Sequence, residues 1–175
     1  MARKLHSLLL ALLLALSLVG CGALGEVDGD ELIESGQTGE TSSHDPQTGA
    51  DRIAEDGHYT TKEDVALYLW VYGHLPDNYM TKKEAQKLGW PGGSLEPYAP
   101  GCCIGGDRFG NYEGILPDGP AYFECDIATM GAKGRGAKRI VFSDDGLIYY
   151  TADHYESFTR IWFTEDYEMK EAEVK

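Results

Sequence analysis

The feature of this sequence that most constrains its fold is a change of pattern near residue 102. Residues 60–90 carry two helical patterns, whereas the chain after residue 102 has short runs rich in Ile, Val, Tyr and Phe, separated by Gly, Pro and Asp. Such runs are typical of strands joined by turns. Helices followed by strands, without alternation, predict an α+β fold with a twisted antiparallel sheet of about five strands. We expect the N-terminal helices to pack on one face of this sheet, which leaves the other face free to hold a site.

Both expected helices have recognisable ends. In TTKEDVALYLWVYGHLP, residues 60–76, Thr60 or Thr61 is the expected N-cap, apolar residues recur at helical spacing, and Gly73 stops the run. In MTKKEAQKLGW, residues 80–90, Thr81 and Glu84 have the spacing of a capping box, in which each side chain bonds the backbone of the other residue. The first third of the domain is therefore predicted to be helical.

The expected strands are the runs CCIGGDRF, AYFECDI, KRIVFSD, LIYYTADHY and SFTRIWF. The Asp-Gly pair in SDDGLIYY lies between the third and fourth runs and is a hairpin signal. The fourth run includes His154, which we therefore expect to lie in an alternating strand.

The first 20 residues are typical of an export signal. Arg3 and Lys4 precede an almost wholly apolar run from Leu8 to Val19, which is too short for a comfortable membrane span. The run ends in Leu-Val-Gly before Cys21, which resembles a bacterial lipoprotein box. This predicts a signal peptide over 1–20 and lipid on Cys21, so that the protein is extracellular and anchored to the outer face of the cell membrane. An ordinary secretory signal is the alternative.

At 175 residues the chain has room for one domain plus extensions, and the extensions are acidic. Residues 21–56 are rich in Gly, Ser, Thr, Asp and Glu and lack aromatic residues, which predicts a flexible linker. Residues 164–175 form a charged C-terminal tail, and much of the net charge of −14 lies in these two segments. The folded domain is expected over 57–163. Its basic segment contains Lys133, Arg135, Lys138 and Arg139.

Three cysteines remain once Cys21 is assigned to lipid. Cys102, Cys103 and Cys125 are an odd set for an oxidising compartment, and one arrangement is a single pair with one free thiol. A metal site is disfavoured, because adjacent cysteines lack the spacing of a ligand pair and no nearby His completes a set.

Two further residues could carry acid–base chemistry. Glu124 lies in the middle of an expected strand, on the face opposite to Phe123 and Cys125, and His154 follows 30 residues later. A carboxylate base and an imidazole acid across a cationic patch would suit phosphodiester cleavage. Periodicity does not place the two side chains opposite each other, so solvated surface residues are the alternative.

Four longer blocks of the domain are LPDNYMTKKEAQKLGW (75–90), APGCCIGGDRFGNYEGILP (99–117), ECDI (124–127) and GRGAKRIVFSDDGLIYYTADHYESFTRI (134–161). They resemble the barnase family of guanyl-preferring microbial ribonucleases and occur in the family's order. Length changes are confined to loops around 91–98, 118–121 and 128–133. The resemblance implies a barnase-like fold from about Val65 to about Ile161, and Cys125 replaces a small buried residue of the family, which implies a free core thiol.

The resemblance also implies catalytic roles for the residues that match the family's motifs. Glu124 in ECDI matches the general base, and His154 in ADHY matches the general acid. The other matching positions are the phosphate-binding cations and an active-site tyrosine: Lys82, Arg135, Arg139 and Tyr155.

Supporting and substrate-binding roles are implied in the same way. Asp107 matches a carboxylate that supports the Lys82 region, and Asp126 matches one that pairs with the two arginines. The loop that grips guanine through its backbone N–H groups and a carboxylate falls on Phe109, Gly110, Asn111, Tyr112 and Glu113.

The implied reaction is cleavage of single-stranded RNA 3′ of guanine. The ribose 2′-hydroxyl attacks its own phosphate and leaves a 2′,3′-cyclic phosphate, which water then opens. Because the RNA supplies its own nucleophile, the resemblance implies neither a metal nor a cofactor. It further implies a monomer that binds RNA and a small acidic, barstar-like inhibitor protein. Tyr112 replaces an arginine of barnase, which bears on the affinity for both partners. A degenerate surface lipoprotein that binds nucleic acid or another ligand without cleaving is the alternative function.

Overall fold

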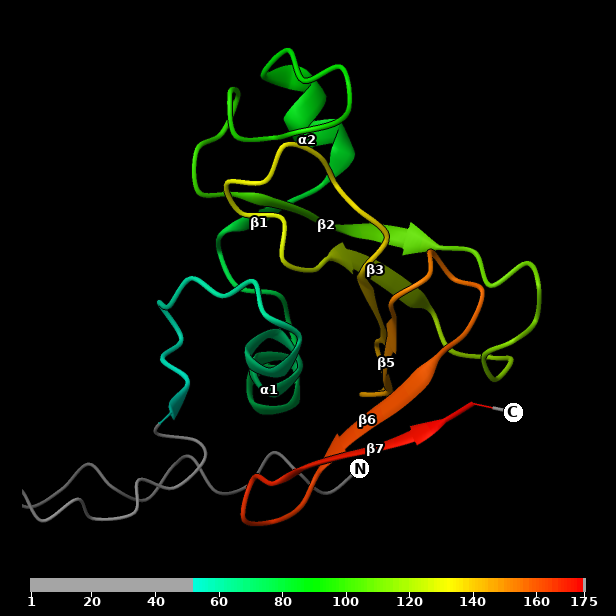
Figure 1. The fold of residues 1–175 in the computed structure, drawn as a ribbon. Helices are drawn as coiled ribbons and strands as arrows, with labels where there is room; N and C mark the ends of the chain where they lie inside the picture. Colours follow the sequence, from blue (N-terminus) through cyan, green and yellow to red (C-terminus); the bar gives the residue numbers. More distant parts are fainter. Residues whose placement is uncertain (1–51, 175) are drawn as a thin grey trace, which may run out of the picture. The chain divides into compact units, whose positions relative to one another are not determined.

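The computed structural model describes residues 52–174 of the chain (Figure 1). The expected signal peptide, Cys21 and most of the expected linker lie outside these residues. The described part contains two helices, α1 (Lys62–Tyr72) and α2 (Lys82–Lys87), and the strands β1 (Tyr79–Met80), β2 (Cys103–Phe109), β3 (Tyr122–Asp126), β4 (Arg139–Ser143), β5 (Ile148–Thr151), β6 (Thr159–Phe163) and β7 (Met169–Glu173).

The strands form one seven-stranded sheet in the order β1-β2-β3-β4-β5-β6-β7. Strands β2 to β7 pair antiparallel, and β1 pairs with β2 in parallel. The predicted α+β architecture is confirmed, but the predicted strand number of about five is too low. The two extra strands are β1, which is only two residues long, and β7, which lies within the segment that the sequence indicates as a charged tail.

Helix α1 has the ends that the sequence predicts. The Thr61 side chain accepts a hydrogen bond from the Asp64 N–H at the start of the helix, and Gly73 closes it in a left-handed conformation with φ 77°. The chain before α1 is also packed, because Ile53 is buried and its carbonyl accepts a hydrogen bond of 2.8 Å from the Tyr72 hydroxyl. The packed domain therefore begins before residue 57.

Alternate residues of the central strands lie on opposite faces of the sheet. Cys125 and Ile140 pack with α1 in one core, and Figure 1 shows α1 on that side of the strands. Val141 and Tyr149 belong to another buried cluster. Glu124 pairs in register with Val141, which pairs with Tyr149, so these side chains share the face opposite to α1.

Helix α2 begins with the predicted capping box, in which Thr81 and Glu84 each bond the backbone of the other. Behind it lies a separate small cluster of buried residues, in which Ala85 packs with Trp90, Leu95 and Ile104. This cluster supports the turn-rich segment 88–101. Figure 1 shows the connection between β3 and β4 reaching towards α2 and this segment.

Strand β5 ends at Thr151, which is earlier than the sequence predicts. His154 does not lie in an alternating strand: it has φ 61° and Tyr155 has φ 77°, both in the left-handed region. Two consecutive non-glycine residues in this region turn the chain sharply between β5 and β6, so the prediction of a strand through His154 is wrong.

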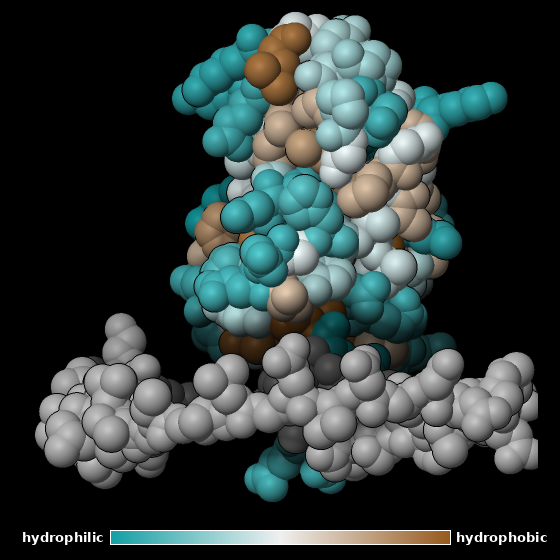
Figure 2. Space-filling model, turned by 90° about the vertical axis from the view of Figure 1, so that its left-hand side faces the viewer, coloured by the Kyte–Doolittle hydropathy of each residue, from teal (hydrophilic) through white to brown (hydrophobic). Residues whose placement is uncertain are grey.

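Cys102, Cys103 and Cys125 are all free, and the last two are buried. Within residues 52–174, neither helix has both the length and the apolar character that crossing a membrane requires. Polar side chains cover most of the face shown in Figure 2, and hydrophobic ones form small separate groups there.

Candidate active site

Strand register brings the central acidic residues of the site together. Asp107 on β2 pairs with Glu124 on β3, and two residues further along β3, Asp126 pairs with Arg139 on β4. Side chains two residues apart on one strand share a face, so Glu124 and Asp126 point to the same side of the sheet. That side is the one opposite to α1.

The Glu124 carboxylate is held at both oxygens. Oε1 lies 2.5 Å from the Lys82 ammonium, and Oε2 accepts a hydrogen bond from the Tyr155 hydroxyl. The residue is 7% exposed. Burial raises the pKa of the Glu124 carboxyl, but the bonds from Lys82 and Tyr155 and the charge of Arg135 outweigh burial, and the net effect lowers the pKa. Glu124 is therefore an ionised and nearly dry carboxylate, which is unlike a solvated strand residue.

Lys82 reaches Glu124 from the first turn of α2. Its own backbone N–H donates a 2.9 Å hydrogen bond to Oδ2 of Asp107, which ties the start of the helix to β2. The capping box between Thr81 and Glu84 fixes the same turn from the other side. The start of α2, and with it the position of Lys82, is thus fixed by the local capping box and by Asp107, which lies 25 residues further along the chain.

Asp126 binds both arginines of the basic segment. Arg135 donates to it through Nε at 2.7 Å and through Nη2 at 2.8 Å, which is a bidentate pair. Arg139 Nε lies 2.9 Å from Asp126 Oδ1, within ion-pair distance but outside hydrogen-bond geometry, so this Nε has no hydrogen-bond partner in the described part of the chain. Arg139 Nη1 donates to the carbonyl oxygens of Arg135 and Lys138.

His154 and Tyr155 are presented by a turn that sequence periodicity did not predict. The Thr151 hydroxyl accepts the Tyr155 N–H at 3.0 Å and donates to Asp153 at 2.8 Å. Asp153 in turn binds the Ser157 hydroxyl at 2.6 Å, and the bonds from Ser157 and Thr151 lower the pKa of the Asp153 carboxyl to about 2. Short polar residues that bond nearby backbone favour such turns. The run of Thr, Asp and Ser in TADHYES was therefore the available signal.

Tyr155 connects the two candidate proton-transfer residues. Its hydroxyl binds Glu124, and its ring centroid lies 4.8 Å from that of His154, whose side chain is exposed. Burial and the neighbouring Glu124 carboxylate raise the pKa of the Tyr155 phenol, while the Arg139 charge opposes that shift. The phenol therefore stays protonated and able to donate to Glu124.

The loop after β2 forms one wall of a cleft of about 550 Å³, and the turn that carries His154 and Tyr155 forms another. The Phe109 and Tyr155 rings lie 5.2 Å apart within it. Asn111 has φ 45°, and its side-chain amide bonds both the N–H and the carbonyl of Leu116, which closes the loop on itself. From the end of β2 and the loop that follows it, the residues lining the cleft are Arg108, Phe109, Gly110, Asn111, Tyr112, Glu113 and Ile115.

A family model described as ribonuclease matches residues 63–162, which is more than half of the chain. The chain belongs to the ribonuclease family. A ribonuclease from Bacillus intermedius is 46% identical over 123 residues, covering 66% of this chain and 75% of that protein. A ribonuclease from Heyndrickxia coagulans is 50% identical over 105 residues, covering 58% of this chain and 95% of that protein. The guanyl-specific ribonuclease St of Saccharopolyspora erythraea is 49% identical over 55 residues, covering 30% of this chain and 54% of that protein.

The side chains of the candidate site gather around Glu124 and Asp126 on the sheet face opposite to α1. The cations Lys82, Arg135 and Arg139 lie around Glu124 and Asp126, and Tyr155, His154 and the loop 109–113 follow. A cationic end, an ionised carboxylate and an exposed imidazole beside a cleft are the groups that phosphodiester cleavage uses. Among residues 52–174, no group of three or more His, Cys, Asp or Glu side chains is arranged to hold a metal ion.

Proposed function

We propose that this protein is a secreted endoribonuclease that cleaves single-stranded RNA 3′ of guanine. Cleavage proceeds by transphosphorylation to a 2′,3′-cyclic phosphate, which is then hydrolysed. The observation that carries the proposal is the ionised Glu124 carboxylate, held by Lys82 and Tyr155 next to the exposed His154. The similarity to the guanyl-specific ribonuclease St supports the preference for guanine.

Glu124 acts as the general base of the first step. It takes the proton of the ribose 2′-hydroxyl, and the oxygen attacks the adjacent phosphorus. Because the pKa of Glu124 is lowered, the carboxylate is ready to accept this proton at neutral pH. The Lys82 ammonium, whose side chain is 37% exposed, exchanges part of its contact with Glu124 for the incoming phosphate.

His154 acts as the general acid of the same step. Its imidazolium gives a proton to the departing 5′-oxygen, which leaves the cyclic phosphate. In the second step His154 takes a proton from water, the hydroxide attacks phosphorus, and Glu124 returns its proton to the 2′-oxygen. Each of these proton transfers typically contributes about 10²–10⁴-fold to the rate.

The three cations stabilise the negative charge that builds on the phosphorane oxygens. Arg135 binds Asp126 through Nε and Nη2, so its other N–H groups are available to bind phosphate. Arg139 has a side chain that is only 3% exposed, and it acts from within the site through Asp126 and Tyr155. Lys82 and Arg135 are therefore the direct phosphate ligands.

The cleft beside His154 holds the guanine base. Phe109 and Tyr155 offer aromatic surface, and the backbone N–H groups of the loop together with the Glu113 carboxylate bind the base edge.

RNA oligomers that differ only in the base 5′ of the scissile phosphate test the proposed binding of guanine. Guanine should be preferred, the products should carry cyclic phosphate ends with EDTA present, and Glu113→Gln should reduce the preference by about ten-fold or more. Equal cleavage after all four bases would contradict it, and Glu165→Gln is the charge-matched control.

Secretion and a lipid anchor on Cys21 complete the proposal, and the apolar run before Cys21 supports them. Cys21→Ala should release the protein from membranes into the medium. A wild-type protein that is already fully soluble outside the cell would contradict the anchor.

An acidic, barstar-like inhibitor would fill the cationic end of the site and protect the producing cell. The cluster of Lys82, Arg135 and Arg139 supports such a partner, because it offers charges that carboxylates bind well. Titration calorimetry with a barstar-type protein should show a one-to-one complex with monomeric enzyme, and Arg135→Ala should weaken it.

A further inference from the structure

The segment that carries Arg135 has little conformational order of its own. Residues 127–138, between β3 and β4, are rich in small residues: Ala128, Gly131, Ala132, Gly134, Gly136 and Ala137. Ala128, Gly131 and Gly136 have positive φ. Glycine loses more backbone freedom on ordering than other residues, so such a segment holds one conformation only when contacts from outside fasten it.

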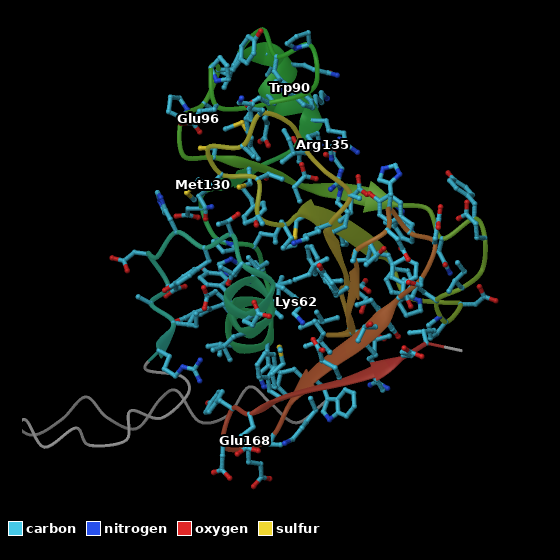
Figure 3. The ribbon with its side chains drawn as sticks, viewed as in Figure 1. Lys62, Trp90, Glu96, Met130, Arg135 and Glu168 are labelled. Carbon is cyan, nitrogen blue, oxygen red and sulfur yellow. The ribbon has the colours of Figure 1, made fainter. Side chains whose placement is uncertain are left out.

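Two side chains from the segment 91–101 fasten the outer end of this connection. The Ser94 hydroxyl donates a 2.6 Å hydrogen bond to the Ala132 carbonyl, and Glu96 Oε2 accepts the Gly131 N–H at 3.2 Å. The same Glu96 oxygen accepts the Gly101 N–H at 3.3 Å. Figure 3 labels Glu96 beside Met130 at one side of this region and Arg135 at the other. We call Ser94 and Glu96 the loop clamp.

The loop clamp touches the parts that hold the cations. Gly101 lies just before β2, which carries Asp107, the partner of the Lys82 backbone N–H. The clamped connection carries Arg135, whose guanidinium lies 6.0 Å from the Trp90 ring centroid. Further along the connection, the Ala137 carbonyl accepts the His154 N–H at 3.2 Å. One carboxylate oxygen therefore joins the connection that carries Arg135 to the segment that leads into β2, whose Asp107 binds the Lys82 backbone.

We propose that Glu96, with Ser94, is a positioning residue that holds Arg135 at the phosphate, an inference that rests on the proposed ribonuclease function. Glu96 bonds the connection at Gly131, four residues before Arg135, and is not among the residues that line the cleft beside His154. Its negative charge opposes the approach of RNA. If Glu96 increases the activity, it must therefore do so through its two hydrogen bonds to the backbone. The effect of its charge and the effect of its bonds on activity are thus opposite in sign and can be measured separately.

Measuring kcat/KM on a guanine-containing RNA distinguishes the effect of the Glu96 charge from the effect of its hydrogen bonds. Glu96→Ala removes the charge and both bonds, and should lower kcat/KM by about ten-fold. Glu96→Gln removes the same charge but keeps an oxygen acceptor, and should restore most of the activity. Ser94→Ala should cause a smaller loss in the same direction. Glu165→Ala changes the net charge equally at an exposed site and should leave kcat/KM unchanged. Equal activity of the Ala and Gln variants at position 96 would overturn the proposal.

A double-mutant cycle shows whether Glu96 acts through Arg135. In an Arg135→Ala background, Glu96→Ala should have little further effect on kcat/KM, because the group that it positions is gone. If Glu96→Ala costs the same factor in both backgrounds, Glu96 supports the fold in general and the proposal fails.

Binding of a single-stranded deoxyribonucleotide oligomer gives a readout that does not depend on cleavage. The logarithm of the binding constant falls with the logarithm of salt concentration, with a slope of about −0.7 for each phosphate neutralised. Arg135→Ala and Glu96→Ala should each make this slope about 0.7 less steep, and Glu96→Gln should keep the wild-type slope. An unchanged slope in Glu96→Ala, or in Arg135→Ala, would overturn the proposal. If the slopes are as predicted but the wild type does not cut RNA, the proposed ribonuclease function is rejected and the positioning role of Glu96 is retained.

Discussion

The Lys82 ammonium lies 2.5 Å from Glu124 Oε1, while Tyr155 donates to the other oxygen of the same carboxylate. The candidate base is thus engaged on both oxygens before any substrate arrives. A carboxylate in this state stays ionised despite being nearly buried, and the cation beside it is the one that we propose binds the phosphate. In the proposed mechanism, the contact between Lys82 and Glu124 therefore serves both the protonation state of the general base and the position of a phosphate ligand.

Loss of Lys82 should change the pH dependence of cleavage. In Lys82→Ala, burial of Glu124 is opposed by fewer charges, so its pKa should rise and the acid limb of the kcat/KM profile should move to higher pH. Lys83→Ala, on the exposed side of the same turn, should leave the limb in place. An acid limb that does not move in Lys82→Ala would contradict the assignment of Glu124 as the base.

The same contact should affect acid stability. Because the pKa of Glu124 is lower in the folded state than in the unfolded state, its ionisation stabilises the fold above the unfolded-state pKa. This stabilisation is lost as pH falls through the folded-state pKa. Glu124→Gln should therefore unfold with a weaker pH dependence than the wild type in the acid range, measured by urea denaturation at several pH values. An identical dependence would contradict the lowered pKa.

Removing the Asp126 carboxylate should damage both stability and activity. Asp126 is 1% exposed and is the shared partner of Arg135 and Arg139, so Asp126→Asn leaves a buried arginine without its counter-charge. Breaking a buried pair in this way costs on the order of 3 kcal/mol of the free energy of unfolding. Chemical denaturation should show this loss. Asp118→Asn, at an exposed position, is the control and should cost less than about 0.5 kcal/mol.

Tyr112 is 94% exposed in the loop after β2 that we propose binds guanine, at the position that the resemblance matches to an arginine of barnase. Tyr112→Arg adds a cation next to the cleft, so RNA affinity should rise at low salt. The slope of log binding constant against log salt should become steeper by about 0.7 if the new side chain contacts one phosphate. Fluorescence binding titrations with a single-stranded oligomer measure this. An unchanged slope would show that this loop position does not face the RNA backbone.

The ends of α1, the hairpin turn before β5 and the alternation in β3 could be predicted because local chemistry determines them. Thr61 and Gly73 end α1 through their own side chain and backbone, and the Asp-Gly turn before β5 requires a left-handed residue, which Gly146 supplies with φ 92°. The alternation in β3 placed Glu124 on the face opposite to Cys125, and the structure agrees. These features depend on residues within a few positions of each other.

The rest depends on contacts between distant segments or on side-chain bonds within a turn, and periodicity encodes neither. Strand β7 is mostly charged and exposed, and it forms because it pairs with β6 and because Lys62 of α1 lies 2.6 Å from Glu171. The turn at His154 overrides the strand propensity of its neighbours through side-chain bonds to Thr151. In the loop clamp, Glu96 accepts a hydrogen bond from Gly131, which lies 35 residues further along the chain. Neither β7 nor the loop clamp has a local repeat that a sequence pattern could reveal, whereas the signal for the turn at His154 is the local run of Thr, Asp and Ser in TADHYES.

Deleting residues 165–175 should test the contribution of β7. The deletion exposes the edge of β6 and removes the ion pair between Lys62 and Glu171, so the free energy of unfolding should fall by more than about 1 kcal/mol. Glu171→Gln alone should cost only about 0–1 kcal/mol, because the pair lies near the surface. Thermal and urea unfolding compare the two variants. Equal stability of the truncated and full-length chains would show that β7 is dispensable.

Cleavage of a short RNA that contains one guanine tests the central claim most directly. The wild-type chain, Glu124→Gln and His154→Gln are compared with EDTA present, and the products are identified by mass. We predict a single cut that leaves a 2′,3′-cyclic phosphate on the guanosine, slowed by about 10²–10⁴-fold in each variant. Cleavage by the variants at the wild-type rate, or no cleavage by the wild type, would contradict the account.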